Sequence, residues 1–272
     1  MSLAGRHALV TGAGTGIGAA IARALASEGA KLTLVGRRRE KLEEVAETLR
    51  VPAKAGTQEG LRTGLLPSQE HILVAPADVT DREQVDRAFA LARDAQGPVT
   101  ILVNNAGAAE SAPFAKVGED AWQRTMAVNL DALLHCCQAA LPDLLEAEAG
   151  RIVTVASTAG LKGYAYSAPY VAAKHGAVGL TRALAAEYAK TSLTVNAVCP
   201  GFTETEMVGE AIARIRAKTG RSEQEARAEL ARFNPQGRLI EPEEVANAVV
   251  WLCLPGSGSI NGQAIAVAGG EI

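Results

Sequence analysis

The sequence predicts an α/β protein built on a doubly wound, parallel, seven-stranded sheet with helices on both faces. Three observations support this fold class. Short apolar runs rich in β-branched residues alternate with longer segments of helical periodicity, a glycine-rich segment follows the first apolar run, and polar residues follow several later runs. Parallel strands joined by helical crossovers show this alternation, because each crossover covers one face of the sheet.

The chain of 272 residues is expected to fold as one domain, residues 1–272. Helical spacing is clear after the first strand, where Ile17, Ile21 and Leu25 repeat with the period of an α-helix. The seven strands are expected at residues 7–11, 31–35, 72–76, 100–103, 152–156, 194–198 and 264–267.

Two segments do not follow the alternation. Residues 203–234 have a helical pattern with an apolar stripe at Val208, Ile212 and Ile215, and we expect a small helical flap over the substrate. The same stripe would also suit helices that pack on the body in every state. Residues 51–70 contain prolines and glycines without periodicity, which predicts a surface insertion.

The composition is that of an ordinary soluble globular protein. The net charge is −3, with 48% hydrophobic and 21% charged residues, so neither a nucleic acid nor an acidic membrane surface is an expected partner. No apolar segment reaches the roughly 18 residues of a membrane span, and we expect a cytoplasmic protein. The four cysteines show no C-x-x-C spacing, so no metal site is predicted: Cys136, Cys137, Cys199 and Cys253.

The segment ALVTGAGTGIGAAIARAL predicts a Rossmann-type phosphate loop. Glycines permit a tight turn and let backbone N–H groups approach a pyrophosphate at the positive end of the helix dipole. A glycine run alone also fits a plain turn, but here strand, loop and helix follow in the order that dinucleotide binding requires. The predicted phosphate-loop residues are Gly12, Gly14, Thr15, Gly16, Ile17 and Gly18. Residues after the next strands complete the predicted crevice: Asp78, Val79, Asn105, Ala106 and Gly107.

The loop after the second strand selects the dinucleotide. A carboxylate there would bind the ribose 2′-hydroxyl of NAD, whereas a cation would bind the 2′-phosphate of NADP. The segment LTLVGRRRE places Arg37 and Arg38 at this point, and Glu40 lies a turn too far along to replace the acid. We therefore expect NADP(H) to be preferred, with NAD possible. A solvated basic turn at a helix start is the alternative interpretation.

Tyr170 and Lys174 are one helical turn apart and share a helix face. A phenol of pKa about 10 is a poor acid or base at neutral pH unless its anion is stabilised. One cation about 4 Å away is worth about 4 kcal/mol at an effective dielectric of about 20. That energy equals about three pKa units, so Lys174 is expected to bring the Tyr170 phenol near neutrality.

Ser157 ends an apolar strand 13 residues before Tyr170. Its hydroxyl is expected to hold the substrate oxygen that the phenol protonates. A serine at the end of a strand also fits a plain helix cap or turn residue.

Several motifs occur in a fixed order along the chain: T-G-x-x-x-G-I-G at 11–18, N-N-A-G at 104–107, Asn129 in AVNLDA, Ser157, Y-V-A-A-K at 170–174, and VNAVCPGFTET. On these motifs the chain resembles the short-chain dehydrogenase/reductase family over nearly its whole length. The resemblance implies a catalytic tetrad of general acid/base, helper lysine, carbonyl-orienting serine and water-relay asparagine: Tyr170, Lys174, Ser157 and Asn129.

The resemblance implies more than the tetrad. Residues of the segment after the sixth strand are expected to contact the nicotinamide end of the cofactor: Pro200, Gly201, Thr203 and Thr205. Similarity to relatives also implies a homotetramer, with a dimer possible. Many relatives have an aspartate where this chain has Ala268, which weakens any inference about the C-terminal interface.

The substrate is expected to be a small molecule or a carrier-bound acyl group. Within the family the chain looks similar to 3-oxoacyl carrier reductases and polyketide ketoreductases, and also to 3-hydroxybutyrate dehydrogenases. The arginines favour an NADPH-dependent ketone reductase over an NAD-dependent dehydrogenase, and a non-catalytic NADP-binding protein is the third reading. Basic residues on the flap would suit a phosphopantetheine or CoA carrier, although solvated helix charges explain them equally well: Arg214, Arg216, Lys218, Arg221 and Arg227.

Overall fold

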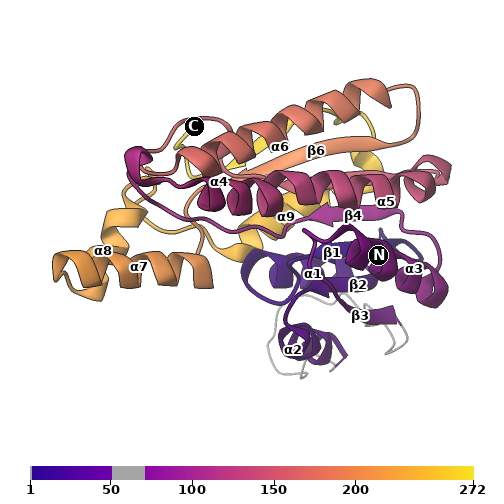
Figure 1. The fold of residues 1–272 in the computed structure, drawn as a ribbon. Coiled ribbons are helices and arrows are strands. Elements are labelled where there is room, and N and C mark those ends of the chain that lie inside the picture. The colour runs from indigo at the N-terminus through magenta and orange to yellow at the C-terminus, as the bar shows by residue number, and fades with distance from the viewer. Residues whose placement is uncertain (1, 51–70) are drawn as a thin grey trace.

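The computed structural model describes residues 2–50 and 71–272 (Figure 1). The predicted surface insertion at 51–70 lies outside the described residues. The strands are β1 (His7–Thr11), β2 (Lys31–Gly36), β3 (Ile72–Pro76), β4 (Ile101–Asn104), β5 (Arg151–Val155), β6 (Thr194–Pro200) and β7 (Ala264–Val267). The helices are α1 (Gly16–Ser27), α2 (Arg39–Arg50), α3 (Arg82–Gln96), α4 (Glu119–Met126), α5 (Ala132–Glu146), α6 (Ala168–Glu187), α7 (Glu206–Thr219), α8 (Glu223–Ala231) and α9 (Pro242–Cys253).

All seven strands pair in parallel, in the order β3-β2-β1-β4-β5-β6-β7. The predicted fold class is therefore confirmed, and every predicted strand lies within two residues of an observed one. The order reverses at β1, which pairs with β2 on one side and with β4 on the other. Ligands of doubly wound sheets bind outside the carboxyl ends of the strands at such a reversal.

The two faces of the sheet carry separate apolar cores. Leu9 and Val10 are neighbours in β1, and because successive strand residues point to opposite faces, they belong to different cores. Val10 packs in the core that includes α1, α2 and α9, through buried residues such as Leu25 and Val249. Leu9 packs in the core that includes α3 and α5, where Phe89 is 1% exposed. Covered on both faces, the strands need no alternation of polar and apolar residues.

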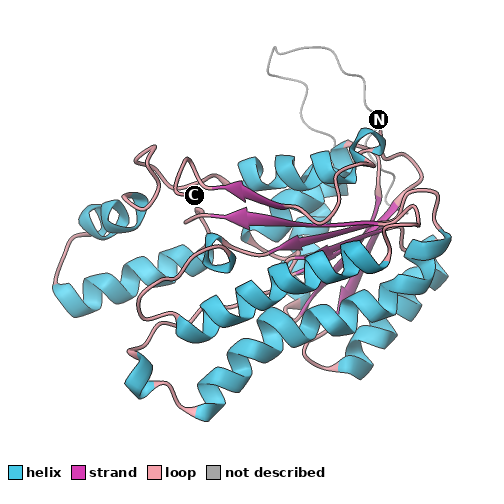
Figure 2. Cartoon of the chain, turned by 90° about the horizontal axis from the view of Figure 1, so that it is seen from above, coloured by secondary structure: helices cyan, strands magenta, loops and turns pink. Residues whose placement is uncertain are grey.

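The helices α7 and α8 form the flap, and they project beyond the end of the sheet toward which the strand arrowheads point (Figure 2). Thr205 caps α7, and a capping box at Ser222 starts α8. The apolar stripe of α7 packs mainly within the flap itself, because Val208 and Ile212 share a small core with Leu230 of α8.

Within the described part of the chain, none of the helices is both long enough and apolar enough to cross a membrane.

Candidate active site

The glycine loop after β1 brings backbone N–H groups to the carboxyl end of the sheet. Gly12 and Gly16 have φ values of +65° and +51°, which glycine adopts without strain. A Cβ on Gly18 would lie 2.1 Å from the Gly12 carbonyl oxygen, so α1 packs against the loop more closely than a side chain allows. Thr15 caps α1 without a side-chain hydrogen bond, which leaves the first N–H groups of this helix available to a phosphate.

Asn105 ties the glycine loop to the end of β4. Its side-chain amide donates to the carbonyl oxygens of Thr11 and Gly12 at 3.0 and 3.2 Å. The Thr11 hydroxyl in turn accepts from the backbone N–H groups of Asn105 and Ala106 at 3.0 and 3.1 Å. These bonds fix the two loops on either side of the strand-order reversal, which is where a dinucleotide would cross the sheet.

The end of β2 carries the two arginines that are expected to bind the 2′-phosphate of NADP. Arg37 and Arg38 form the whole connection between β2 and α2, and both side chains are exposed. Arg38 pairs with Glu206, in the first turn of the flap, at 3.0 Å. Arg37 takes part in none of the ion pairs of the described residues, so its guanidinium is the one better placed to receive a phosphate.

Asp78 and Val79 lie at the carboxyl end of β3, beside the β2 loop. One carboxylate oxygen of Asp78 accepts from the backbone N–H and the hydroxyl of Thr80, at 2.9 and 2.8 Å. Val79 is buried, and its carbonyl oxygen lies 3.2 Å from Nδ1 of His135 on α5. Both residues therefore have a fixed backbone at the adenine side of the expected crevice.

Asn129 lies in a π-helical turn, residues Ala127–Asp131, that interrupts the helix formed by α4 and α5. Such turns are frequent at functional sites, because they leave backbone groups without their usual partners. Asn129 is 1% exposed, and its amide donates to the carbonyl oxygens of Thr125 and Ala108 at 2.9 and 2.8 Å. A Cβ on Gly107 would lie 2.8 Å from Asn129 Oδ1 and 3.6 Å from Lys174 Nζ, so Gly107 lies between these two groups.

Tyr170 and Lys174 lie on one face of α6, as predicted. The Lys174 ammonium is buried, donates to the Val155 carbonyl oxygen at 3.0 Å, and lies 5.6 Å from the centroid of the Tyr170 ring. Burial lowers the pKa of Lys174 to about 8. Burial also raises the pKa of Tyr170, and the hydrogen bond with Ser157 opposes this rise. The expected lowering of the phenol pKa by Lys174 is therefore wrong for this arrangement, because burial disfavours both charged forms.

Ser157 follows β5 on extended backbone and lies beside the Tyr170 phenol. Its hydroxyl oxygen accepts from the Ala159 backbone N–H at 3.1 Å, which fixes the side chain at the start of a short 3₁₀ turn. The cap role and the catalytic role therefore do not exclude each other. One hydroxyl accepts from its own turn while its proton faces outward to another oxygen.

The turn after β6 leads back to the glycine loop. Pro200 ends β6, and the backbone N–H of Gly201 donates to Val267 of β7 at 3.0 Å. The Thr203 hydroxyl donates to the Gly201 carbonyl oxygen at 3.0 Å, and the Thr205 hydroxyl donates to the Thr203 carbonyl oxygen at 3.2 Å. A Cβ on Gly16 would lie 3.0 Å from the Thr205 methyl group. The start of the flap is thus in contact with the phosphate loop.

Two further tyrosines, Tyr164 and Tyr166, lie on the loop between Ser157 and Tyr170. The Tyr164 ring meets Phe202 and Phe233 edge to face, each at a centroid distance of 6.1 Å. Tyr166 is 65% exposed and has a φ of +65°, which places it in a surface turn. Tyr164 therefore joins residues 156–167, the segment that carries Ser157 and is called the catalytic loop below, to the flap, whereas Tyr166 belongs to the surface.

Two features of this site have no signal in the sequence. Asn129 was identified by resemblance, since nothing in its spacing predicts a π-helical turn. Glu271 was not identified at all, although its side chain is 2% exposed and reaches Tyr164 and Lys162. A carboxylate that is next to last in the chain has no periodicity that could have revealed it.

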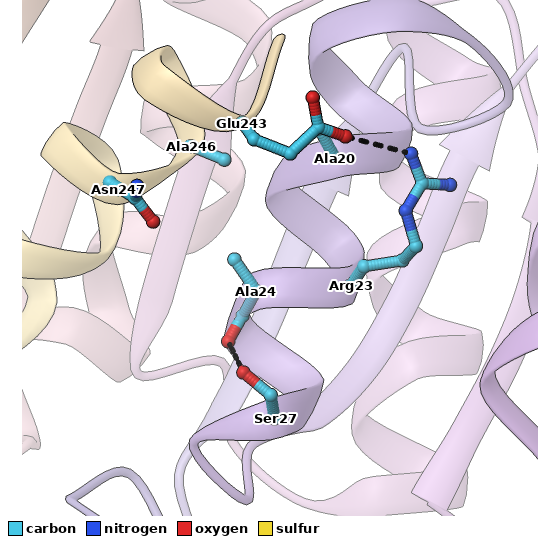
Figure 3. Close-up of a pocket in the computed structure, with 7 residues that line it drawn as sticks. All are labelled: Ala20, Arg23, Ala24, Ser27, Glu243, Ala246 and Asn247. Carbon is cyan, nitrogen blue, oxygen red and sulfur yellow. Dashed lines mark hydrogen bonds and ion pairs between the residues drawn. The ribbon is translucent and has the colours of Figure 1, made fainter. Parts of the chain in front are cut away.

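A shallow pocket of about 320 Å³ lies between α1 and α9, away from these residues (Figure 3). An ion pair between Arg23 and Glu243, at 3.7 Å, crosses it. It is lined by Ala20, Arg23, Ala24, Ser27, Glu243, Ala246 and Asn247, and contains none of the candidate catalytic or cofactor-binding residues. It is an ordinary groove between two packed helices.

The residues at the strand-order reversal fit a dinucleotide. The close approach of Gly12 and Gly18 forms the cradle that a side chain would fill, and the α1 N-terminus supplies N–H donors beside it. Arg37 offers a cation at the adenosine end, and Lys174 with Tyr170 offers polar groups at the other.

Comparison with known proteins gives consistent results. The model of the short chain dehydrogenase family matches residues 6–215. A protein named "Putative ketoacyl reductase" from Streptomyces coelicolor is 37% identical over 265 residues, which is 97% of this chain and 95% of that protein. The D-beta-hydroxybutyrate dehydrogenase of Cupriavidus necator is 34% identical over 261 residues, 96% and 95% of the two chains. The crystal structure of an actinorhodin polyketide ketoreductase variant with NADPH has a TM-score of 0.87 and 35% identity, covering 98% of this chain and 97% of that one.

Proposed function

The chain belongs to the short-chain dehydrogenase family and is an NAD(P)-dependent oxidoreductase, and from this premise we propose that it reduces the ketone of a 3-oxoacyl thioester or a similar compound with NADPH. The observation that carries the proposal is the position of the Tyr170 phenol, beside Ser157 and one helical turn from the buried Lys174. An acid, a hydrogen-bond donor and a cation converge at the carboxyl end of β5, which is what a developing alkoxide needs.

Residues on both sides of the strand-order reversal would hold the cofactor. The glycine loop and the α1 N-terminus would bind its pyrophosphate, Asp78 and Val79 its adenine side, and Arg37 and Arg38 the 2′-phosphate. Asn105, Ala106 and Gly107 would line its path across the sheet, and the turn from Pro200 to Thr205 would contact the nicotinamide. When bound, NADPH would supply a hydride to the carbonyl carbon of the substrate.

The proton comes from Tyr170. As the carbonyl oxygen gains negative charge, the phenol O–H gives it a proton and the Ser157 O–H donates a hydrogen bond to it. The raised pKa of Tyr170 makes the phenol a weaker acid than in water, so the proton transfer depends on stabilisation of the tyrosinate by its neighbours. Lys174 then stabilises the tyrosinate that remains, and Asn129, 2.8 Å from a Cβ on Gly107, lies on the route by which a water could return the proton.

Replacement of the catalytic acid tests this function. Tyr170→Phe removes the proton donor and keeps the ring, so we expect turnover to fall by about 10²–10⁴-fold while NADPH affinity stays within about twofold. Tyr166→Phe is the matched control, because that exposed phenol lies outside the site and its loss is expected to leave turnover unchanged. NADPH oxidation is followed in a panel of 3-oxoacyl thioesters and cyclic ketones. Turnover retained by Tyr170→Phe would refute the proposal.

An NAD-dependent 3-hydroxyacid dehydrogenase is the second candidate. It is favoured by the similarity to D-beta-hydroxybutyrate dehydrogenase and by the pairing of Arg38 with Glu206, which partly neutralises one of the two phosphate-binding cations. Dissociation constants for NADPH and NADH, measured by quenching of protein fluorescence, separate the two. Tighter binding of NADH would favour the dehydrogenase.

The flap charges favour a small substrate over a docked carrier. The arginines that made the flap basic in sequence each have a glutamate partner, in the pairs Arg214–Glu210, Arg216–Glu223, Arg221–Glu229 and Arg227–Glu204. A neutralised surface attracts a carrier phosphate weakly. Titration with free CoA at low ionic strength tests this, and micromolar binding would restore the carrier as a partner.

Assembly into a homotetramer completes the proposed enzyme. Leu134 and Leu145 of α5 are 48% and 36% exposed, and Trp251 of α9 is 44% exposed. Large apolar side chains on helix surfaces suit burial against another copy of the chain. Sedimentation equilibrium measures the assembly, and a monomer at micromolar concentration would contradict it.

A further inference from the structure

A chain of polar contacts connects the C-terminal residues to the catalytic loop. The Glu271 carboxylate accepts from the Tyr164 hydroxyl through Oε1, and the Lys162 ammonium lies 2.9 Å from the same oxygen. The Tyr164 and Thr158 hydroxyl oxygens are 2.6 Å apart, and Thr158 directly follows Ser157. Both ribbon views place the C-terminus at the end of the sheet where the flap projects (Figures 1 and 2).

We propose that Glu271 is a positioning residue of the substrate site, which acts by fixing Tyr164 as a wall of the cleft. This inference rests on the proposed ketone reduction, whose substrate would enter between the catalytic loop and the flap. The carboxylate is fixed from several sides, because its side chain is 2% exposed and its Oε2 lies 3.1 Å from a Cβ placed on Gly201. Oε2 is buried without a hydrogen-bond partner, so the fold bears a desolvation cost to keep the group there.

The charge of Glu271 sets the direction of the hydrogen bonds. An ionised carboxylate only accepts, so the Tyr164 O–H has to donate to Glu271. The phenol oxygen then has no proton for Thr158, and the Thr158 hydroxyl has to donate to it. Burial and the bond to Glu271 also raise the pKa of Tyr164, which keeps the phenol protonated.

The direction of these hydrogen bonds gives Tyr164 and Tyr170 different roles. Tyr164 has its proton committed to Glu271 and keeps one oxygen lone pair for a further hydrogen bond. It cannot act as a second acid that competes with Tyr170. A substrate group that meets Tyr164 should accordingly be apolar or carry a hydrogen-bond donor, such as the hydroxyl of a ring-bearing ketone.

The aromatic contacts explain why the position of Tyr164 matters for substrates. Its ring contacts Phe202, which follows the Pro200–Gly201 turn, and Phe233, which follows α8 of the flap. These three rings come from the loop after Ser157, the segment after β6 and the segment after α8. Release of Tyr164 from Glu271 would let the ring leave this cluster, so the effect should fall on large substrates that reach it.

Steady-state kinetics of Glu271→Ala and Glu271→Gln with two ketones test the proposal. A two-ring ketone serves as the large substrate and butanone as the small one. For Glu271→Ala we expect the KM of the two-ring ketone to rise by about three- to tenfold, the range that loss of one hydrogen bond gives. Its kcat and the KM of butanone should stay within about twofold. Glu271→Gln keeps the size of the side chain and should show a smaller rise.

Two further variants complete the test. Tyr164→Phe should reproduce the KM effect, and the double variant with Glu271→Ala should add little to it, because both changes break the same contact. Glu83→Gln, at an 85% exposed side chain on α3, is the control and should match the wild type. The proposal is overturned by an unchanged KM for the two-ring ketone, or by an equal loss of kcat with both ketones. If none of the ketones is a substrate for the wild type, so that NADPH is not oxidised, the proposed function fails and not this inference.

Discussion

Replacement of Lys174 by methionine should stabilise the folded protein while it removes activity. Lys174 is 5% exposed, and burial lowers its pKa from an ordinary 10.5 to about 8. At pH 7 the folded state therefore holds a buried charge, at a cost of about 3 kcal/mol. Methionine has a similar length and no charge. It loses the hydrogen bond to Val155 and the cation–π contact with Tyr170, together about 1–2 kcal/mol, so we expect a net gain of about 1–2 kcal/mol.

The pH dependence of this gain identifies its cause. Between the folded pKa of about 8 and the unfolded value, the unfolded chain binds more protons at Lys174 than the folded one. The free energy of unfolding of the wild type should therefore rise with pH relative to Lys174→Met. From pH 7 to pH 9 the difference should shrink by about 1.4 kcal/mol. The other titratable groups are the same in both proteins, so their contributions to the difference in the free energy of unfolding cancel.

Urea denaturation followed by tryptophan fluorescence at the two pH values measures the difference, and the two tryptophans of the chain provide the signal. Lys174→Arg is the matched control, because it keeps a charge that does not titrate in this range and should show no such pH effect. The reasoning is refuted if the wild type is the more stable protein at pH 7, or if the difference does not change with pH.

Three other predictions follow from the same structure: one on cofactor preference, one on the glycines and one on pH dependence. Arg37→Asp replaces the cation at the end of β2 by a carboxylate and should shift the ratio of NADPH to NADH affinities by about 10- to 100-fold toward NADH, measured as dissociation constants. Gly18→Ala places a Cβ 2.1 Å from the Gly12 carbonyl oxygen and should abolish cofactor binding or folding, whereas Gly179→Ala, with no atom within 4 Å, should stabilise α6 by about 0.5–1 kcal/mol in thermal melts. The reductive kcat/KM should be level below about pH 8 and fall above it, as Lys174 loses its proton; a profile that rises there would contradict the assigned role of the lysine.

Much of the site could be predicted because its parts are local in the chain. The spacing of Tyr170 and Lys174 puts them on one face of α6, since helix geometry alone sets that relation. The glycines between β1 and α1 likewise follow from a backbone conformation that other residues avoid. Strand boundaries agreed within two residues, because a sheet covered on both faces needs continuous apolar runs.

The pKa of Tyr170 could not be predicted in the same way. Spacing gives the distance between two side chains on a helix, but it does not give their burial. In the folded chain, Lys174 is buried against Val155 of β5 and the loop at Gly107, and burial raises the pKa of Tyr170 by more than the hydrogen bond with Ser157 lowers it. The sign of the shift was therefore a property of the packing.

The sequence by itself determined the order of strands and helices, the phosphate loop and the pairing of Tyr170 with Lys174, since each depends on backbone geometry over a few residues. The tertiary structure decided which distant groups meet: Glu271 with Tyr164, 107 residues earlier, and Arg38 with Glu206, 168 residues later. Such contacts depend on where the chain returns after crossing the sheet, and no local periodicity records that position.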